Sequence, residues 1–261
     1  MAAAAAGRLR DLGLDPVTVV VAAVGTRGDG PEGDARAARY AALSEAAQDL
    51  DACCVLLGHT LDDQAETVLL GLARGSGARS LSGMRPRSGI YRRPLLDLGR
   101  VTTERACAAE DLTVWHDPHN ADPVFARVRV RHRVMQMLEG ELGPGVAEAL
   151  ARTARLLRDD ADALDELAAA ARADCRTADD SDIGLDVERL ASLLPAVRRR
   201  VLRSAALDAG CPATDLTAGH VDAVEALVTD WHGQRGVDLP GSVQAVREQG
   251  TVRMRQRAVG G

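Results

Sequence analysis

The stretch ACCVLLGHTLDDQAETVLLGLARG, residues 52–75, carries the strongest fold signal in the chain. Its first eight residues are almost continuously apolar, which predicts a parallel strand buried on both faces. After an acidic turn, apolar side chains recur at helical spacing at Leu61, Ala65, Val68, Leu69 and Leu72, and Gly75 then ends the pattern. A strand, a polar turn and an amphipathic helix in this order are typical of an α/β domain.

The residues before this stretch extend the same alternation. A short helix over residues 2–13 precedes VTVVVAAV, residues 17–24, whose β-branched side chains predict a strand. The helix expected over residues 34–50 then leads to the second strand. Because two parallel strands bury too little surface to be stable alone, we expect this sheet to need further strands.

The second half of the chain changes character near residue 139. Apolar periodicity predicts long helices over residues 145–173, 190–210 and 218–231, and the tail predicts a β-hairpin that turns at Gln249-Gly250. We therefore expect an α/β N-terminal domain with a parallel sheet, residues 1–138, and a mainly α-helical C-terminal domain with a small β-hairpin, residues 139–261.

Composition limits the function classes. The 261 residues have a net charge of -6, which argues against bulk nonspecific nucleic-acid binding but permits a local basic patch. Five cysteines without metal-ligand spacing indicate reduced thiols and no metal site. Neither a signal peptide nor a membrane-spanning apolar run is visible, so we expect a cytoplasmic protein that does not enter a membrane.

The acidic turn has a structural and a functional interpretation. Thr60 and Asp63 have the spacing of a capping box at the start of the helix, which leaves His59, Asp62 and Glu66 unexplained. In a parallel sheet, ligands bind where a strand ends and the next helix starts. Carboxylates placed there suit either Mg²⁺ held together with substrate phosphates or the ammonium group of a substrate.

Two further motifs are less specific. Residues 28–33 match G-x-G-x-x-G, but the first glycine lies three residues beyond the predicted strand and no acid ends the next strand, so we do not expect a dinucleotide site. Four arginines alternate with other residues, which indicates either a solvated charged face or a stripe that follows RNA phosphates. They are Arg127, Arg129, Arg131 and Arg133.

The segment HTLDDQAETVLLGLARGSGARSLSGMRP, residues 59–86, resembles the H-x-x-D-D-x-x-E-T…R-G-S-G segment of tRNA(Ile)-lysidine synthetases, members of the PP-loop ATP pyrophosphatase superfamily. The similarity continues through GDARAARYAAL, RRPLLDLGR, WHDPHNADPVFARVRVR, LLPAVRRRVLR and LPGSVQAVREQGTVRMR, and so covers nearly the whole chain. It implies a PP-loop (HUP-like) catalytic domain followed by a tRNA-recognition domain.

The resemblance also implies a reaction. ATP adenylates the C2 carbonyl of cytidine 34 in tRNA(Ile), and the ε-amino group of L-lysine attacks that carbon to form lysidine and release AMP. The implied cofactors are ATP and Mg²⁺, the implied partners are tRNA(Ile) and L-lysine, and a homodimer is one hypothesis for the assembly.

Site residues carry over from the matching motifs. Asp63 and Glu66 would recognise lysine, and Asp62 and His59 would line the same catalytic pocket. The remaining residues fall into two groups, ATP-binding Arg36, Arg39, Arg74, Gly75 and Gly77, and RNA-binding Arg93, Arg127 and Arg131.

Two alternatives stay open. One is a noncatalytic remnant that binds tRNA without ATP or lysine. The other is a different PP-loop tRNA-modifying enzyme, such as a tRNA thiolase, which needs an accessible cysteine pair. Because Cys53 and Cys54 lie in the predicted buried strand, we expect them to be poorly exposed.

The sequence departs from the family at several positions. Thr60 follows His59 where the family often has a second histidine, His119 replaces a serine, and Val128 replaces an asparagine. The S-G-G-x-D-S loop that cradles ATP phosphates in the family occurs nowhere in the sequence. We expect that this loop belongs upstream of Met1 and that the chain is N-terminally truncated.

This expectation predicts that the 261-residue chain shows no lysine-dependent ATP–pyrophosphate exchange, because side chains alone would have to hold the ATP phosphates. A chain extended upstream through the loop should show exchange in the same assay. Exchange by the 261-residue chain would contradict the prediction.

Overall fold

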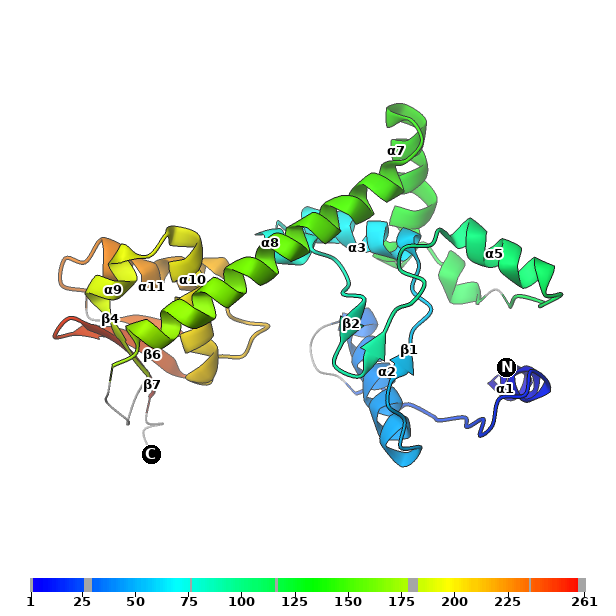
Figure 1. The fold of residues 1–261 in the computed structure, drawn as a ribbon, viewed down its shortest axis with the longest axis horizontal. Coiled ribbons are helices and arrows are strands. Elements are labelled where there is room, and N and C mark those ends of the chain that lie inside the picture. Colours follow the sequence, from blue (N-terminus) through cyan, green and yellow to red (C-terminus); the bar gives the residue numbers. More distant parts are fainter. Residues whose placement is uncertain are drawn as a thin grey trace. The chain divides into compact units, whose positions relative to one another are not determined.

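The computed structural model describes residues 2–25, 30–75, 77–115, 117–177, 183–234 and 236–257. These form two compact units, Met1–Leu156 and Leu157–Gly261. The division falls within helix α8 (Val146–Cys175), which contributes residues to both units (Figure 1). The domain boundary after residue 138 stays a prediction from sequence.

The first unit is mainly helical. The predicted helices over residues 2–13, 34–50 and 61–73 are confirmed, with small differences at their ends. The helices of this unit before α8 are α1 (Ala2–Asp11), α2 (Gly30–Asp49), α3 (Leu61–Ala73), α4 (Gly77–Leu81), α5 (Arg100–Ala109), η1 (Pro118–Ala121), α6 (Ala126–Arg129), the π-helical turn η2 (Val130–Val134) and α7 (Met135–Leu142).

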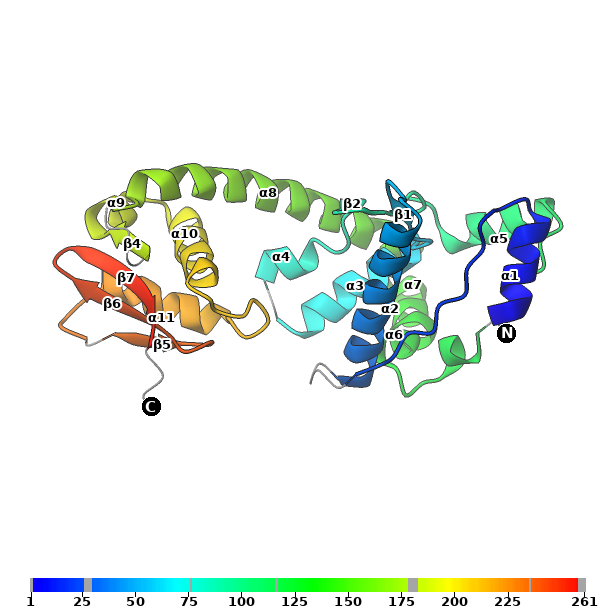
Figure 2. The same ribbon diagram turned by 90° about the horizontal axis from the view of Figure 1, so that it is seen from below.

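A small sheet lies beside α2 (Figures 1 and 2). Its strands are β1 (Val55–Leu56), β2 (Arg87–Ser88) and β3 (Tyr91–Arg92), in the order β1-β3-β2. Strand β1 pairs with β3 in parallel and β2 pairs with β3 antiparallel. The predicted parallel strand is thus confirmed, but its predicted burial is wrong, since Leu56 is 67% exposed.

The strand predicted over residues 17–24 is wrong for this structure. These residues join no sheet, and Val21 is 92% exposed. A strand is stabilised by ladder hydrogen bonds to a neighbour, and the described residues offer this segment no such neighbour. High β-propensity is therefore not enough to form a strand here.

Helix α3 is anchored by its own polar residues. The side-chain amide of buried Gln64 accepts a hydrogen bond from the Met84 N–H at 2.7 Å and donates one to the Met84 carbonyl at 3.1 Å. A Cβ atom at Gly83 would stand only 2.6 Å from this amide, so the close approach requires glycine. Ala65 and Val68 are buried, and Gly75 follows the helix at φ +63°. These contacts fix the helix that carries the acidic turn.

The second unit contains the larger sheet. Strands β4 (Ile183–Asp186), β5 (Val237–Leu239), β6 (Val243–Glu248) and β7 (Thr251–Gln256) are antiparallel in the order β4-β7-β6-β5. The hairpin of β6 and β7 turns at Gln249-Gly250, both with positive φ, as predicted. Strand β4 was not expected from the sequence. The helices predicted over residues 145–173 and 218–231 are confirmed as α8 and α11 (Ala218–Thr229), whereas the single helix predicted over residues 190–210 is wrong, since two helices occur there, α9 (Val187–Ser192) and α10 (Pro195–Asp208).

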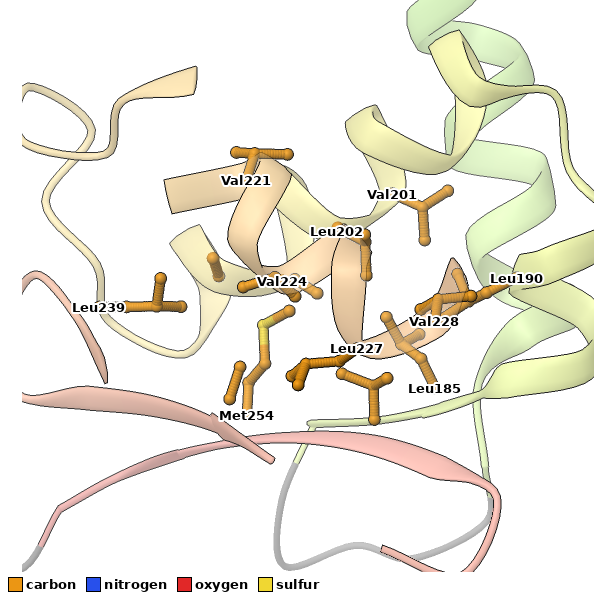
Figure 3. Packing of buried hydrophobic residues seen from close by; sticks show 14 of the residues in the cluster. Leu185, Leu190, Val201, Leu202, Val221, Val224, Leu227, Val228, Leu239 and Met254 are labelled. Atoms are coloured by element: carbon orange, nitrogen blue, oxygen red, sulfur yellow. The ribbon is translucent and has the colours of Figure 1, made fainter. Parts of the chain in front are cut away.

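Its core is built from small and branched aliphatic side chains. Figure 3 shows Leu227 of α11 beside Met254 of β7, with Val201 and Leu202 of α10 farther from the sheet, and each of the four side chains is nearly inaccessible to solvent. Val243 and Ala245 of β6 and Val252 and Met254 of β7 enter this core at the two-residue spacing of one sheet face, and Val246 of β6 is buried outside the core. Within the described ranges, no helix combines the length and apolar character that crossing a membrane requires.

Candidate functional site

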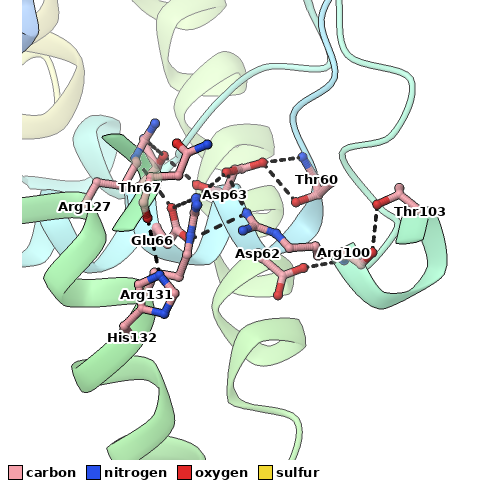
Figure 4. A network of polar contacts seen from close by, with 11 residues as sticks. Thr60, Asp62, Asp63, Glu66, Thr67, Arg100, Thr103, Arg127, Arg131 and His132 are labelled. Atoms are coloured by element: carbon pink, nitrogen blue, oxygen red, sulfur yellow. Dashed lines mark hydrogen bonds and ion pairs between the residues drawn. The ribbon is translucent and has the colours of Figure 1, made fainter. Parts of the chain in front are cut away.

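The three acids of the turn meet arginines from two other segments (Figure 4). Asp62 and Asp63 lie in the first turn of α3, and Glu66 follows one turn later. Arg127 and Arg131 are four residues apart, on α6 and the π-helical turn, so they face the same side of the helix. Arg100 begins α5. Arg127 and Arg131 thus form ion pairs with Glu66, so a solvated face is the wrong interpretation for these two arginines, and their contact with RNA phosphates stays a prediction.

Glu66 forms the closest contact of the site. Its side chain is 2% exposed, and its two oxygens accept hydrogen bonds from Arg131, Oε1 from Nε at 2.6 Å and Oε2 from Nη2 at 2.9 Å. Arg127 Nε lies 3.6 Å from Oε2, while Arg127 Nη2 donates to Thr67 Oγ1 at 2.9 Å. A two-pronged guanidinium–carboxylate pair is the strongest ionic geometry in proteins.

Asp63 closes the predicted capping box. Its Oδ2 accepts hydrogen bonds from the Thr60 N–H at 2.8 Å and the Thr60 hydroxyl at 3.0 Å. Its Oδ1 lies 3.0 Å from Arg131 and 3.3 Å from Arg100. Burial alone would raise the pKa of Asp63, but the Thr60 hydrogen bonds and then the two arginines hold that pKa below its ordinary value. Asp63 is therefore a carboxylate at neutral pH.

Asp62 binds the start of a different helix, α5. Its Oδ2 accepts the backbone N–H of Arg100 at 2.6 Å and so caps α5, whose own cap residue Gly99 has no side chain. Among the described residues, its other oxygen accepts no hydrogen bond and forms no ion pair. This oxygen leaves Asp62 with spare capacity for a ligand.

Two cavities open beside the acids. The larger, of about 730 Å³, is lined by Asp62, Asp63, Arg100 and Arg131, together with Glu104 and Trp115. The smaller, of about 400 Å³, is lined by Asp62, Glu66 and Arg131. Asp63 and Glu66 are thus paired with arginines, yet the cluster still faces open space.

His59 lies apart from the carboxylate pairs, in a basic environment. The pKa of His59 is lowered to about 4, mainly by burial and further by Arg93, Arg36 and Arg127, against an opposite effect of Asp63. The imidazole is therefore neutral at pH 7. Arg93 is buried, and its Nη1 donates to the Arg85 carbonyl at 2.7 Å.

Other sequence candidates lie elsewhere. Arg39 and Arg74 are exposed, and nothing approaches within 4 Å of the positions that side chains would take at Gly75 and Gly77. Their predicted contacts with ATP stay predictions. Of the G-x-G-x-x-G motif, residues 28 and 29 lie outside the described residues, and Gly30 begins α2.

The sequence reasoning missed several residues of the site. Arg100 is the last residue of the RRPLLDLGR segment, and its place in that motif is the sequence feature that could have identified it as a site residue. Trp115 lines the larger cavity at 53% exposure. Cys53 is exposed and Cys54 is half-buried, so the expectation that both would be hidden in a strand was wrong.

The acidic cluster does not fit a metal ion. Each carboxylate already accepts hydrogen bonds or ion pairs from a guanidinium or a backbone N–H. No group of three metal-ligating side chains occurs within the part of the chain that the structure describes. Carboxylates with these partners suit cationic side chains and organic ammonium groups better than Mg²⁺.

Comparisons with known proteins cover nearly the whole chain. A family model for a PP-loop domain matches residues 11–138, and one for a TilS substrate binding domain matches residues 185–253. The tRNA(Ile)-lysidine synthase of Streptomyces coelicolor is 56% identical, covering 95% of this chain and 70% of that protein. The enzyme of the same name from Thermobifida fusca is 55% identical, over 95% of this chain and 75% of that protein.

Among solved structures, U34-tRNA thiolase NcsA from Methanococcus maripaludis is similar in part. The TM-score is 0.46 at 19% identity, covering 60% of this chain and 56% of that chain.

The buried ion pair predicts a large effect of Glu66→Gln on stability. Removing the charge takes the ion pair from Arg127 and leaves Arg131 only its contact with Asp63, which should lower the free energy of unfolding by about 3 kcal/mol in urea denaturation. Asp208→Asn is the control, because it breaks the exposed pair with Arg172 and should cost less than about 1 kcal/mol. Equal effects of the two substitutions would contradict a buried role for Glu66.

The lowered pKa of His59 predicts a pH dependence of stability. An unfolded histidine titrates near 6.5, whereas folded His59 titrates at about 4. Between these values the unfolded chain binds a proton that the folded chain does not, so stability falls as pH drops through this window. The His59→Gln variant should lose part of that slope in denaturation measured from pH 7 to pH 5. Substitution of the exposed His132 by glutamine is the matched control. If stability depends on pH as steeply in His59→Gln as in the unsubstituted chain, the lowered pKa of His59 is refuted.

Proposed function

This chain belongs to the tRNA(Ile)-lysidine synthase family, and from that premise we propose that it ligates lysine to C2 of cytidine 34 in the anticodon of tRNA(Ile), driven by ATP. The O2 atom of the cytosine first attacks the α-phosphorus of ATP, the bond from that phosphorus to the β-phosphate oxygen breaks, and pyrophosphate leaves. The lysine ε-amine then attacks C2, a carbon–nitrogen bond forms, the carbon–oxygen bond breaks, and AMP leaves with that oxygen while the amine loses a proton.

The observation that supports this proposal most directly is that the three acids have different partners. Glu66 is fully engaged by Arg131, and both oxygens of Asp63 have partners. Asp62 alone keeps an oxygen without a partner among the described residues, and it lines the larger cavity. We therefore assign the lysine ammonium to Asp62, with Asp63 contributing negative charge nearby and Glu66 fixing Arg131.

The same cavity suits the rest of a free amino acid. Arg100 and Arg131 present guanidinium groups on its wall, which match the planar carboxylate of lysine. Glu104 and Asp117 add negative charge for a second amine. A site with both signs of charge favours a zwitterion that carries one extra ammonium group.

Further parts of the proposal concern the partners. The PP-loop family supports the use of ATP, and we propose that Mg²⁺ arrives with the ATP phosphates rather than on the acidic cluster. Lysine as the second substrate, a homodimeric assembly and a cytoplasmic location complete the proposal.

A second candidate function is tRNA binding without catalysis. It draws on the arginines that the family resemblance assigns to RNA, which are Arg93, Arg127 and Arg131. Lysine binding separates the two candidates, because a binding remnant has no need to retain an amino-acid site.

We predict that Asp62→Asn weakens lysine binding about tenfold in isothermal titration calorimetry, because a charged hydrogen bond to the ammonium is lost. Asparagine is itself a good helix cap, so the hydrogen bond from the Arg100 N–H should survive.

Norleucine, which lacks the ε-amine, serves as the ligand control and should bind both chains equally weakly. Asp97→Asn, at an exposed position, is the protein control. Lysine affinity that is unchanged in Asp62→Asn would remove Asp62 from the site.

A further inference from the structure

The segment of residues 17–24 has the composition of a strand but no strand beside it. Its sequence, VTVVVAAV, carries no charge and is rich in β-branched side chains. Figure 2 shows it as an extended trace between α1 and α2. The Val17 carbonyl accepts a hydrogen bond from Arg10, whereas among the described residues the backbone groups of residues 18–24 have no hydrogen-bond partner. An unpaired edge of this kind is a template for pairing with another chain.

The side chains of the 17–24 segment are also open to solvent. Val21 is 92% exposed and Val24 is 60% exposed, and Val19 and Val20 are each half exposed. Single apolar residues on a surface are ordinary, but a continuous exposed apolar stretch marks an interaction site. Both the backbone and the side chains of this segment therefore lack the contacts that a strand normally makes.

A groove of about 410 Å³ lies between the 17–24 segment and helix α2. The helix contributes small side chains to its wall, Ala38, Ala41 and Ala42, whose spacing places them on one face. Asp34 and Glu45 line the groove one helical turn beyond these alanines on either side. The small side chains leave room for the side chains of one further strand, laid beside the segment and over the helix.

The chemistry of the groove selects an uncharged strand as its occupant. A wall of alanines provides no partner for a charged side chain, and the two carboxylates at its ends disfavour an acidic one. A second copy of the chain carries a suitable strand, the 17–24 segment itself. Because this segment is uncharged, two copies can pair without like-charge repulsion.

We propose that two copies of this chain associate by antiparallel pairing of their 17–24 segments, with the strand of each copy seated in the groove beside α2 of the other. A two-fold axis then lies between Val20 and Val21, and Val17 of one copy is opposite Val24 of its partner. Each copy supplies both a strand and a groove, so every contact is made twice. The proposal rests on the homodimeric assembly proposed above and names its interface.

This pairing accounts for the strand that the sequence predicts and the single chain does not form. An antiparallel pair of eight residues forms about eight ladder hydrogen bonds, which would satisfy the unused backbone groups of residues 18–24. It would also remove from water the valine side chains that are exposed in one copy. The missing neighbour is then a second copy of the same segment.

The first test compares the oligomeric state of the 261-residue chain with that of Val21→Lys by analytical ultracentrifugation. We expect the unsubstituted chain to dimerise and the dissociation constant of Val21→Lys to be about tenfold higher or more, because a lysine on a strand edge blocks pairing and the two-fold axis brings two of them together. Since Val21 is 92% exposed, the substitution leaves the folded single chain intact.

Val124→Lys is the matched control, because Val124 is 76% exposed and does not line the groove. It should dimerise as strongly as the unsubstituted chain. A monomeric unsubstituted chain, or a dimer that is equally strong in Val21→Lys, would overturn the proposal.

The second test uses only the unsubstituted chain. Hydrogen–deuterium exchange is measured by mass spectrometry above and below the dissociation constant of the dimer. Peptides that contain residues 17–24 should exchange more slowly in the dimer, whereas those from the β6–β7 hairpin should not change. A dimer without slower exchange at residues 17–24 would overturn the interface.

Lysine binding is titrated in the same samples, because it reports on the site at Asp62 alone. A chain that binds lysine but shows no protection of residues 17–24 overturns the interface and leaves the catalytic assignment in place. Protection of residues 17–24 in a chain that does not bind lysine supports the interface and counts against the catalytic assignment.

Discussion

The contact between Glu66 and Arg131 is the constraint on which the rest of the site depends. It joins residues 65 positions apart in the sequence and fixes α3 against the π-helical turn. Because Glu66 is buried, its charge has to be matched by donors of good geometry, and the two short hydrogen bonds from one guanidinium supply them. With Arg131 fixed, its Nη2 also donates a hydrogen bond to Asp63, and its guanidinium becomes part of the wall of both cavities.

The three acids of one helical turn thus do three different things. Asp63 caps its own helix, Asp62 caps the start of α5, and Glu66 holds an arginine from a distant helix. Only Asp62 combines a structural bond with an unused oxygen at the cavity. This arrangement accounts for a cluster of carboxylates that is stable in itself and still able to receive a cationic substrate.

Local sequence patterns predicted local structure well. The periodicity of residues 61–73 gave α3, the Thr60 and Asp63 spacing gave its capping box, and Gln249-Gly250 gave the hairpin turn. The burial of Leu56 and the strand over residues 17–24 were mispredicted, because both depend on neighbouring strands that a local pattern does not contain.

Contacts between residues far apart in the chain could not be predicted from the sequence either. The residues around Glu66 in the sequence do not indicate that Arg131 binds it. The four alternating arginines were interpreted as one series that faces either solvent or RNA phosphates, whereas in the structure Arg127 and Arg131 lie on one side of a helix and both contact Glu66. The family resemblance named most of the residues but not their pairing.

A double-mutant cycle on Glu66 and Arg131 is the most direct test of this account. The free energies of unfolding of Glu66→Gln, Arg131→Gln and the double variant are compared with that of the unsubstituted chain. The account predicts a coupling energy of about 2 kcal/mol or more, because each partner is needed to neutralise the other in a buried setting. Additive effects, with coupling within about 0.5 kcal/mol of zero, would show that the pair does not organise the site.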